Sequence, residues 1–242
     1  MRVLPAALAA MCWLVLAASS AHAGPPYLSD DPEPTDYQHF EIYAFGDGIQ
    51  SRDGLAGETG IDFNYGGAPD LQLTAVVPLA YDEAGHTGLG NIELAAKYRF
   101  LHQDMDGVDL SIFPRVFLPS VSHIVGDDHA SLLIPLWAEK DYGKWSIFGG
   151  GGCTFNKSRD SQNFCAGGVV VAREVLEGLQ LGLEVFHQGA DTLGGRVSTA
   201  VGGGLTYDVN EHYHLLAYWG PGLQNVSETG RANAYLALLF TF

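Results

Sequence analysis

The stretch that decides the fold is residues 91–100, which read Asn-Ile-Glu-Leu-Ala-Ala-Lys-Tyr-Arg-Phe. From Ile92 to Phe100 every second residue is apolar, and the charged residues of this stretch fall between them. Successive side chains of a β-strand point to opposite faces, so a period of two is typical of a strand and not of a helix. The stretch therefore predicts a strand with one apolar face and one charged face.

The same alternation recurs along the rest of the chain. Residues 179–188 place leucine and valine opposite glutamine, glycine and glutamate, and residues 196–208 repeat the pattern. Twelve such segments are predicted, at residues 38–47, 57–66, 71–80, 88–101, 108–118, 131–140, 145–155, 164–173, 179–188, 196–208, 213–220 and 231–242.

The connections between these segments alternate in length. Tight turns are predicted at residues 67–70, 102–107, 141–144, 174–178 and 209–212. Mostly longer, polar loops are predicted at residues 48–56, 81–87, 119–130, 156–163, 189–195 and 221–230. Short turns at one end, longer loops at the other and an even strand number are typical of bacterial outer-membrane barrels. The predicted fold is all-β: a closed antiparallel transmembrane β-barrel of about twelve strands.

The face opposite the apolar stripe carries charged residues. In the dry core of a water-soluble barrel each unpaired charge would cost several kcal/mol, whereas a membrane barrel turns this face toward a polar lumen. Neighbouring strands lie about 4.8 Å apart, so these charges are expected to meet across hairpins and partly cancel. The residues predicted to line the lumen are Glu41, Asp62, Glu93, Lys97, Arg99, Asp109, Arg115, Arg173 and Glu184.

The two ends of the chain carry further signals. Residues 1–23 have an early arginine, an apolar run and the sequence Ala21-His22-Ala23, which predicts a secretory signal peptide with the mature chain beginning near Gly24. The alternative is a membrane anchor, for which the run is short. Residues 38–242 form the predicted barrel. Its last segment ends in Phe242 with one continuous apolar face, which resembles the strand recognised by the barrel-assembly machinery; the alternative is the final strand of a soluble sandwich.

Residues 24–37 form a proline-rich leader that contains the acidic cluster Asp30-Asp31-Pro32-Glu33. The favoured interpretation is a solvated periplasmic segment stiffened by its prolines. Two alternatives stay open: its carboxylates could hold calcium, or the segment could fold into the barrel as a small plug.

Composition limits the function classes and partners. The formal net charge is −16, which argues against nucleic-acid binding because such proteins need basic patches. No stretch after Ala23 is long and apolar enough for a transmembrane helix, so any membrane crossing must use strands. The expected surroundings are the lipid and lipopolysaccharide of the bacterial outer membrane.

Two cysteines follow the leader, Cys153 and Cys165, and they flank the polar loop 156–163. Residue 159 lies midway between them, so they come opposite each other in an antiparallel hairpin without a slip in register. Export to an oxidising compartment permits a disulfide. The alternative is a pair of unpaired thiols.

Candidate catalytic and metal-binding groups were also considered. His212 and His214 would share a strand face, but a zinc site needs further ligands. A loop carries His123, Asp127, Asp128 and His129, for which a solvated surface is favoured over a cation site. The scattered Ser and His residues form no defensible Ser-His-acid order. The sequence therefore predicts no catalytic residue, metal or cofactor.

The start of the mature chain resembles a known family. Residues 24–34 (GPPYLSDDPEP), His39-Phe40-Glu41-Ile42-Tyr43, Asp70–Tyr81 (DLQLTAVVPLAY) and residues 88–100 (GLGNIELAAKYRF) are similar to segments of a proteobacterial family of outer-membrane transporters of the phenol-degradation meta-pathway. The resemblance covers the first hundred residues, and the rest matches by pattern only. It implies an outer-membrane barrel and a channel for small hydrophobic molecules, and it supplies no catalytic residues.

Three functions are consistent with these features. The first is passage of a small, hydrophobic or aromatic solute across the outer membrane, through a pore that twelve strands would keep narrow or gated. The second is a surface barrel that binds partners through its longer loops. The third is a barrel enzyme that acts on lipid, which the lack of a nucleophile arrangement disfavours.

Overall fold

The computed structural model describes residues 26–119 and 125–242. The predicted signal peptide (residues 1–23), its cleavage site at Gly24 and the loop residue His123 lie outside them. The strands are β1 (Phe40–Gln50), β2 (Leu55–Ala68), β3 (Leu71–Tyr81), β4 (Thr87–Leu89), β5 (Ile92–Leu101), β6 (Asp109–Ile112), β7 (Arg115–Leu118), β8 (Ser131–Tyr142), β9 (Trp145–Phe155), β10 (Phe164–Leu176), β11 (Leu179–Gln188), β12 (Ser198–Asn210), β13 (Tyr213–Gln224) and β14 (Ala232–Thr241). Two single helical turns are α1 (Gln103–Asp106) and α2 (Val226–Thr229).

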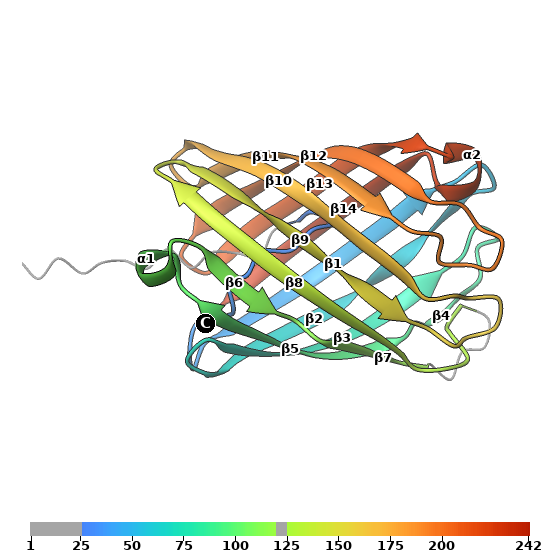
Figure 1. The fold of residues 1–242 in the computed structure, drawn as a ribbon, viewed down its shortest axis with the longest axis horizontal. Helices are drawn as coiled ribbons and strands as arrows, with labels where there is room; N and C mark the ends of the chain where they lie inside the picture. The colour runs from blue at the N-terminus through green and yellow to red at the C-terminus, as the bar shows by residue number, and fades with distance from the viewer. Residues whose placement is uncertain (1–25, 120–124) are drawn as a thin grey trace, which may run out of the picture.

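These strands form one closed antiparallel sheet. Strand β1 pairs with both β2 and β14, and the pairings of β3 with β5 and of β8 with β6 and β7 complete the ring (Figure 1). Two of the twelve predicted strands are each divided in two, residues 88–101 into β4 and β5 and residues 108–118 into β6 and β7. Pro114 falls in the second break, where its missing N–H interrupts the ladder. The predicted closed barrel of twelve strands is confirmed.

The two ends of the cylinder differ. Four hairpins turn through two residues at the end that carries α1, here called the short-turn end. In these turns Asp70, Gly143 and Gly178 have φ values of 61°, 63° and 72°, as tight hairpin turns demand of one or both central residues. The opposite, long-loop end carries β4 and α2 (Figure 1).

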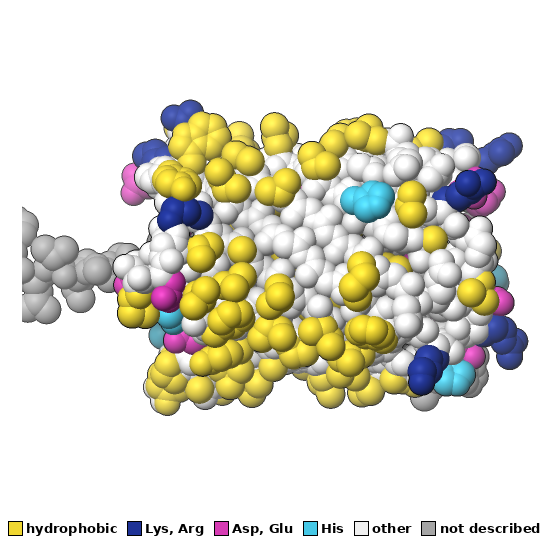
Figure 2. Space-filling model, in the orientation of Figure 1, with side chains coloured by type: hydrophobic (Ala, Val, Ile, Leu, Met, Phe, Trp, Pro, Cys, Tyr) yellow, Lys and Arg dark blue, Asp and Glu magenta, His cyan; other side chains and the backbone are white. Residues whose placement is uncertain are grey.

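The outer wall of the barrel is apolar. Large hydrophobic side chains such as Leu183 and Leu236 are 73% and 57% exposed. In Figure 2 hydrophobic side chains cover much of the wall, while lysine, arginine and acidic side chains gather at the two ends of the cylinder. Within the described ranges no helix is long and apolar enough to span a membrane. An apolar outside with polar groups inside is the reverse of a water-soluble barrel.

Candidate functional site

Residues 26–37, here called the N-terminal segment, lie inside the barrel. The segment joins the wall at the short-turn end, where Tyr37 bridges Gly66, and Figure 1 shows it in dark blue within the cylinder. Ser29 and Thr35 are only 1% and 3% exposed. The favoured expectation of a solvated periplasmic leader at residues 24–37 is thus corrected for its described part, and the plug alternative describes what the structure shows.

One wall of the barrel holds the segment through a single carboxylate. The backbone nitrogens of Leu28 and Ser29 donate hydrogen bonds of 3.1 and 2.7 Å to the two carboxylate oxygens of Glu184 on β11. Glu184 is 2% exposed, so these charge-assisted bonds satisfy a buried charge. A residue that the sequence assigned only to the lumen therefore anchors the N-terminal segment.

Tyr27 fits the same wall by shape. Its ring lies edge-on to Phe148 of β9 and Tyr218 of β13, with centroids 5.8 Å apart in both cases, and its hydroxyl donates to the Gly204 carbonyl over 3.2 Å. A Cβ added at Gly182 or Gly204 would lie 2.2 or 2.6 Å from the Tyr27 side chain. Only glycine leaves room for the ring at these two positions of β11 and β12.

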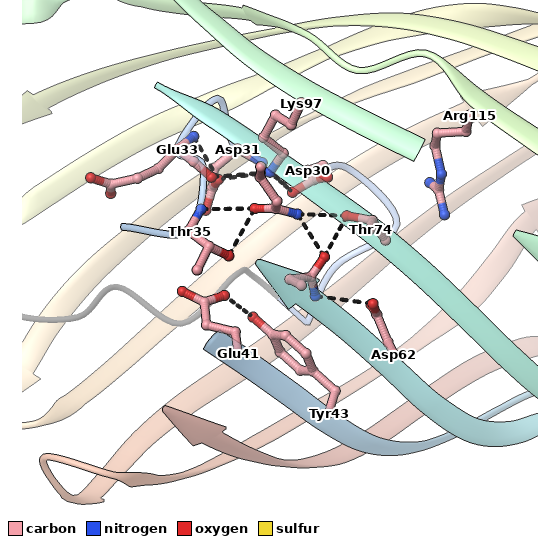
Figure 3. A network of polar contacts seen from close by, with 12 residues as sticks. Asp30, Asp31, Glu33, Thr35, Glu41, Tyr43, Asp62, Thr74, Lys97 and Arg115 are labelled. Carbon is pink, nitrogen blue, oxygen red and sulfur yellow. Dashed lines mark hydrogen bonds and ion pairs between the residues drawn. The ribbon is translucent and has the colours of Figure 1, made fainter. Parts of the chain in front are cut away.

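The opposite wall holds the segment through charge. Lys97 Nζ on β5 lies 3.1 Å from an Asp30 oxygen and 3.4 Å from an Asp31 oxygen, and it donates to the Glu33 carbonyl over 3.2 Å (Figure 3). On β3, the side-chain oxygen of Gln72 accepts from the backbone nitrogen of Thr35 over 2.8 Å. Burial raises the pKa of the Asp31 carboxyl, an effect that the Lys97 ammonium opposes.

Charged side chains of neighbouring strands meet as expected from the register. Arg115 on β7 donates two hydrogen bonds of 2.7 Å to the carboxylate of Glu93 on β5. Arg99 lies 3.2 Å from Asp70 and 3.7 Å from Asp109 of β6. These pairs offset several lumen charges within the wall itself.

Two predicted lumen carboxylates have neutral partners instead. The Tyr43 hydroxyl donates to Glu41 over 3.1 Å, and the Asn64 amide donates to Asp62 over 3.0 Å. Both carboxylates face a cavity of about 210 Å³ between the N-terminal segment and the wall. Figure 3 shows them on neighbouring strands, below Lys97.

Arg173 was predicted to line the lumen, and the structure places it on the outer face. Val170 and Ala172 of β10 are fully buried on the inner face, so alternation turns Arg173 outward. Its guanidinium lies 5.0 Å from the ring centre of Trp145, a cation–π contact near the short-turn end. The other eight predicted residues face inward.

The cysteines form the expected disulfide. Cys153 of β9 and Cys165 of β10 lie directly opposite each other in the strand register and are bonded. The bond joins the two strands just below the loop 156–163 at the long-loop end.

The histidines considered as ligands have other partners. His214 contacts Asp208 at 2.7 Å, while His212 stacks on Phe242. In the loop, Asp127 accepts a hydrogen bond from Asn91. Its neighbour Asp128 pairs with His129, and the hydrogen bond from that ring lowers the Asp128 pKa to about 2. Among the described residues no group of three or more His, Cys, Asp or Glu side chains could hold a metal ion.

The sequence pattern missed several residues of this site. Tyr27, Gln72 and Asn64 were not singled out, because their partners are distant in sequence or uncharged. A usable signal was present, however. Three inward positions of β11 and β12 are glycines, Gly182, Gly202 and Gly204, and missing side chains on a lumen face leave space for another segment.

Comparisons with known proteins support the architecture. No protein-family model matches the chain, and no curated protein is similar to it by sequence. Among solved structures, the COG4313 outer membrane channel from Pseudomonas putida F1 superposes with a TM-score of 0.73 at 12% identity, covering 88% of this chain and 98% of the other. A KdgM porin in complex with disordered oligogalacturonate gives 0.55 at 12% identity, covering 84% and 99%. At such identities the likeness shows a shared barrel fold.

Proposed function

We propose that the protein is a bacterial outer-membrane channel for small solutes, and that the N-terminal segment narrows its lumen as a plug. The observation that carries this proposal is the position of the segment, which crosses the lumen. On one wall it contacts Glu184 and Gly204, and on the other wall it contacts Lys97. Its bonds to both walls leave a small cavity beside it instead of an open pore.

Barrel size supports passage of small molecules only. Twelve strands leave a lumen that side chains can largely fill, unlike the channel of a sixteen-strand porin. The space beside the segment measures about 210 Å³, which equals roughly seven water molecules at their share of liquid volume. Aromatic rings of Tyr43, Phe113, Trp137 and Tyr235 line it. These rings support the hydrophobic or aromatic solutes that the family resemblance implies.

The proposed location follows from the outer wall. Its exposed leucines, valines and isoleucines suit the hydrocarbon of the outer membrane, and the charged ends suit lipopolysaccharide and water. The strand that ends at Phe242 is the proposed contact with the barrel-assembly machinery.

Proteoliposome swelling tests the proposal. The liposomes contain folded protein, recognised by a band on an SDS gel that shifts on boiling. They should swell in isotonic glycerol and arabinose and much more slowly in a trisaccharide, because the plugged lumen admits only small solutes. Empty liposomes and liposomes with heat-denatured protein are the controls. Swelling no faster than in empty liposomes, for every solute, would reject the channel.

A further inference from the structure

The lumen has more acidic side chains than basic ones. Lys97, Arg99 and Arg115 are the lysine and arginine side chains that the described strands direct inward, and each is already ion-paired. The inward carboxylates of the same strands include Glu41, Asp47, Glu58, Asp62, Glu93, Asp109, Glu139 and Glu184. The N-terminal segment adds four more acidic residues. The lumen therefore carries an excess of negative charge.

Glu41 and Asp62 are the part of this excess that lines the cavity without a direct ion pair to a described residue; the Lys97 and Arg115 charges act on them only from farther away. They lie on adjacent strands, where Asp62 of β2 is opposite Tyr43 of β1. Their hydrogen-bond donors are a phenol and an amide, both neutral. Neither carboxylate forms an ion pair with any residue of the described ranges. By contrast, Glu93 in the same cavity is held by Arg115.

The rest of the cavity lining consists largely of aromatic rings and one unused donor. Tyr43, Phe113, Trp137 and Tyr235 contribute rings, whose faces attract cations. Trp137 is 5% exposed, and its indole N–H has no hydrogen-bond partner among the described residues. A buried donor without an acceptor is unfavourable, so a ligand oxygen in this cavity would gain a hydrogen bond that the protein does not supply.

From these features we infer that the cavity selects small organic cations, with Glu41 and Asp62 as the specificity-determining residues. The inference rests on the proposed channel function and names the solute class of that same lumen. The favoured solute carries an ammonium group for the two carboxylates, an apolar or aromatic part for the rings, and an acceptor oxygen for Trp137. Anions are disfavoured because the uncompensated charge of a narrow, low-dielectric passage repels them.

Zero-current potentials in planar bilayers test this inference. In a potassium chloride gradient the wild-type protein should pass potassium over chloride by about fivefold or more, since charged side chains set the selectivity of narrow pores. Choline, an ammonium compound with a hydroxyl oxygen, replaces potassium on one side in a second measurement, and it should carry measurable current. The Glu41→Gln/Asp62→Asn double variant should lose at least about half of the potassium-over-chloride ratio and of the choline permeability.

The matched control is Glu139→Gln. Glu139 also faces the lumen from β8 and, like the other two carboxylates, accepts a hydrogen bond from a neutral group, Ser146, but it does not line this cavity. This variant should keep the wild-type permeability ratios. If the double variant does not fold, the single variants Glu41→Gln and Asp62→Asn carry the test, each with a smaller loss in the same direction.

The outcomes separate the two proposals. Failure of wild-type liposomes to swell faster than empty liposomes in any of the solutes rejects the channel itself. Swelling together with an anion preference, with no preference, or with unchanged ratios in the double variant overturns the cation selection and leaves the channel standing.

Discussion

The two walls that grip the N-terminal segment do so by different physical means. On the wall of β9 to β13, glycines make a seat for Tyr27 and one carboxylate accepts two backbone N–H groups. On the wall of β3 to β7, Lys97 gathers two carboxylates, and other charges pair within the wall. The first contact depends on shape, which few substitutions can preserve. The contact on the second wall depends on charge. The adjacent strands β1 and β2 also carry carboxylates without an ion pair among the described residues, Glu41 and Asp62, that face the cavity.

The largest effect is expected from filling the space that Gly182 and Gly204 leave for the Tyr27 ring. Gly204→Val would place side-chain atoms where the Tyr27 ring lies, since even a Cβ would come within 2.6 Å of it. The N-terminal segment should leave this wall, and single-channel conductance should rise about twofold or more, because pore diameter sets conductance. Planar-bilayer recording provides the measurement.

Gly203→Val is the matched control for that variant. Gly203 is the preceding residue of β12 and faces the other way, with its nearest contacts at an ordinary 3.7 Å. This variant makes the same glycine-to-valine change in the same strand, but away from the Tyr27 ring. The conductance of the channel should therefore stay at the wild-type level. Equal conductance in the two variants would show that the seat of Tyr27 does not hold the plug.

A smaller effect on conductance, with a clear effect on stability, is expected from the charged wall. Lys97→Met leaves the buried Asp31 and the partly buried Asp30 without their cation. Removing one partner of a buried pair typically costs about 3–5 kcal/mol, so the urea midpoint of the heat-modifiable band should fall. Conductance should become noisier as the segment loosens at one wall while Tyr27 stays seated at the other.

Lys144→Met serves as the comparison for Lys97→Met. Its pair with Glu174 has side chains that are 59% and 41% exposed, and such surface pairs contribute about 0–1 kcal/mol. Its urea midpoint should hardly change. Similar losses in both variants would mean that Lys97 is no more important to the fold than a surface lysine.

The strands, their faces and the disulfide were predictable because each follows from local alternation. The period of two at residues 92–100 assigned Glu93 and Lys97 to the lumen face, and the structure has both buried there. The disulfide needed only the hairpin centre near residue 159 and an antiparallel register. The tight turns predicted at residues 67–70, 141–144, 174–178 and 209–212 likewise lie together at the short-turn end.

The position of the N-terminal segment was not predictable in the same way. Its anchors join residues far apart in sequence, 155 positions between Ser29 and Glu184 and 67 between Asp30 and Lys97. Alternation says which way a side chain points, and it does not say what meets it. Arg173 shows the complementary error, because its charge suggested the lumen while the strand register turns it outward beside Trp145.

The central claim is that the N-terminal segment sits in the lumen of the folded barrel, and cysteine cross-linking tests it most directly. A Cβ at Gly168 would lie 2.5 Å from Ser29 Oγ and 2.6 Å from the Val185 carbonyl oxygen, so the neighbouring strand must shift slightly to admit it. Because the two positions lie this close, Ser29→Cys/Gly168→Cys, made in a Cys153→Ser/Cys165→Ser background, should form a bond in intact outer membranes under mild oxidation. The locked protein should keep wild-type conductance, because the bond fixes the segment where it already lies. Two freely labelled thiols in folded, heat-modifiable protein would contradict the account.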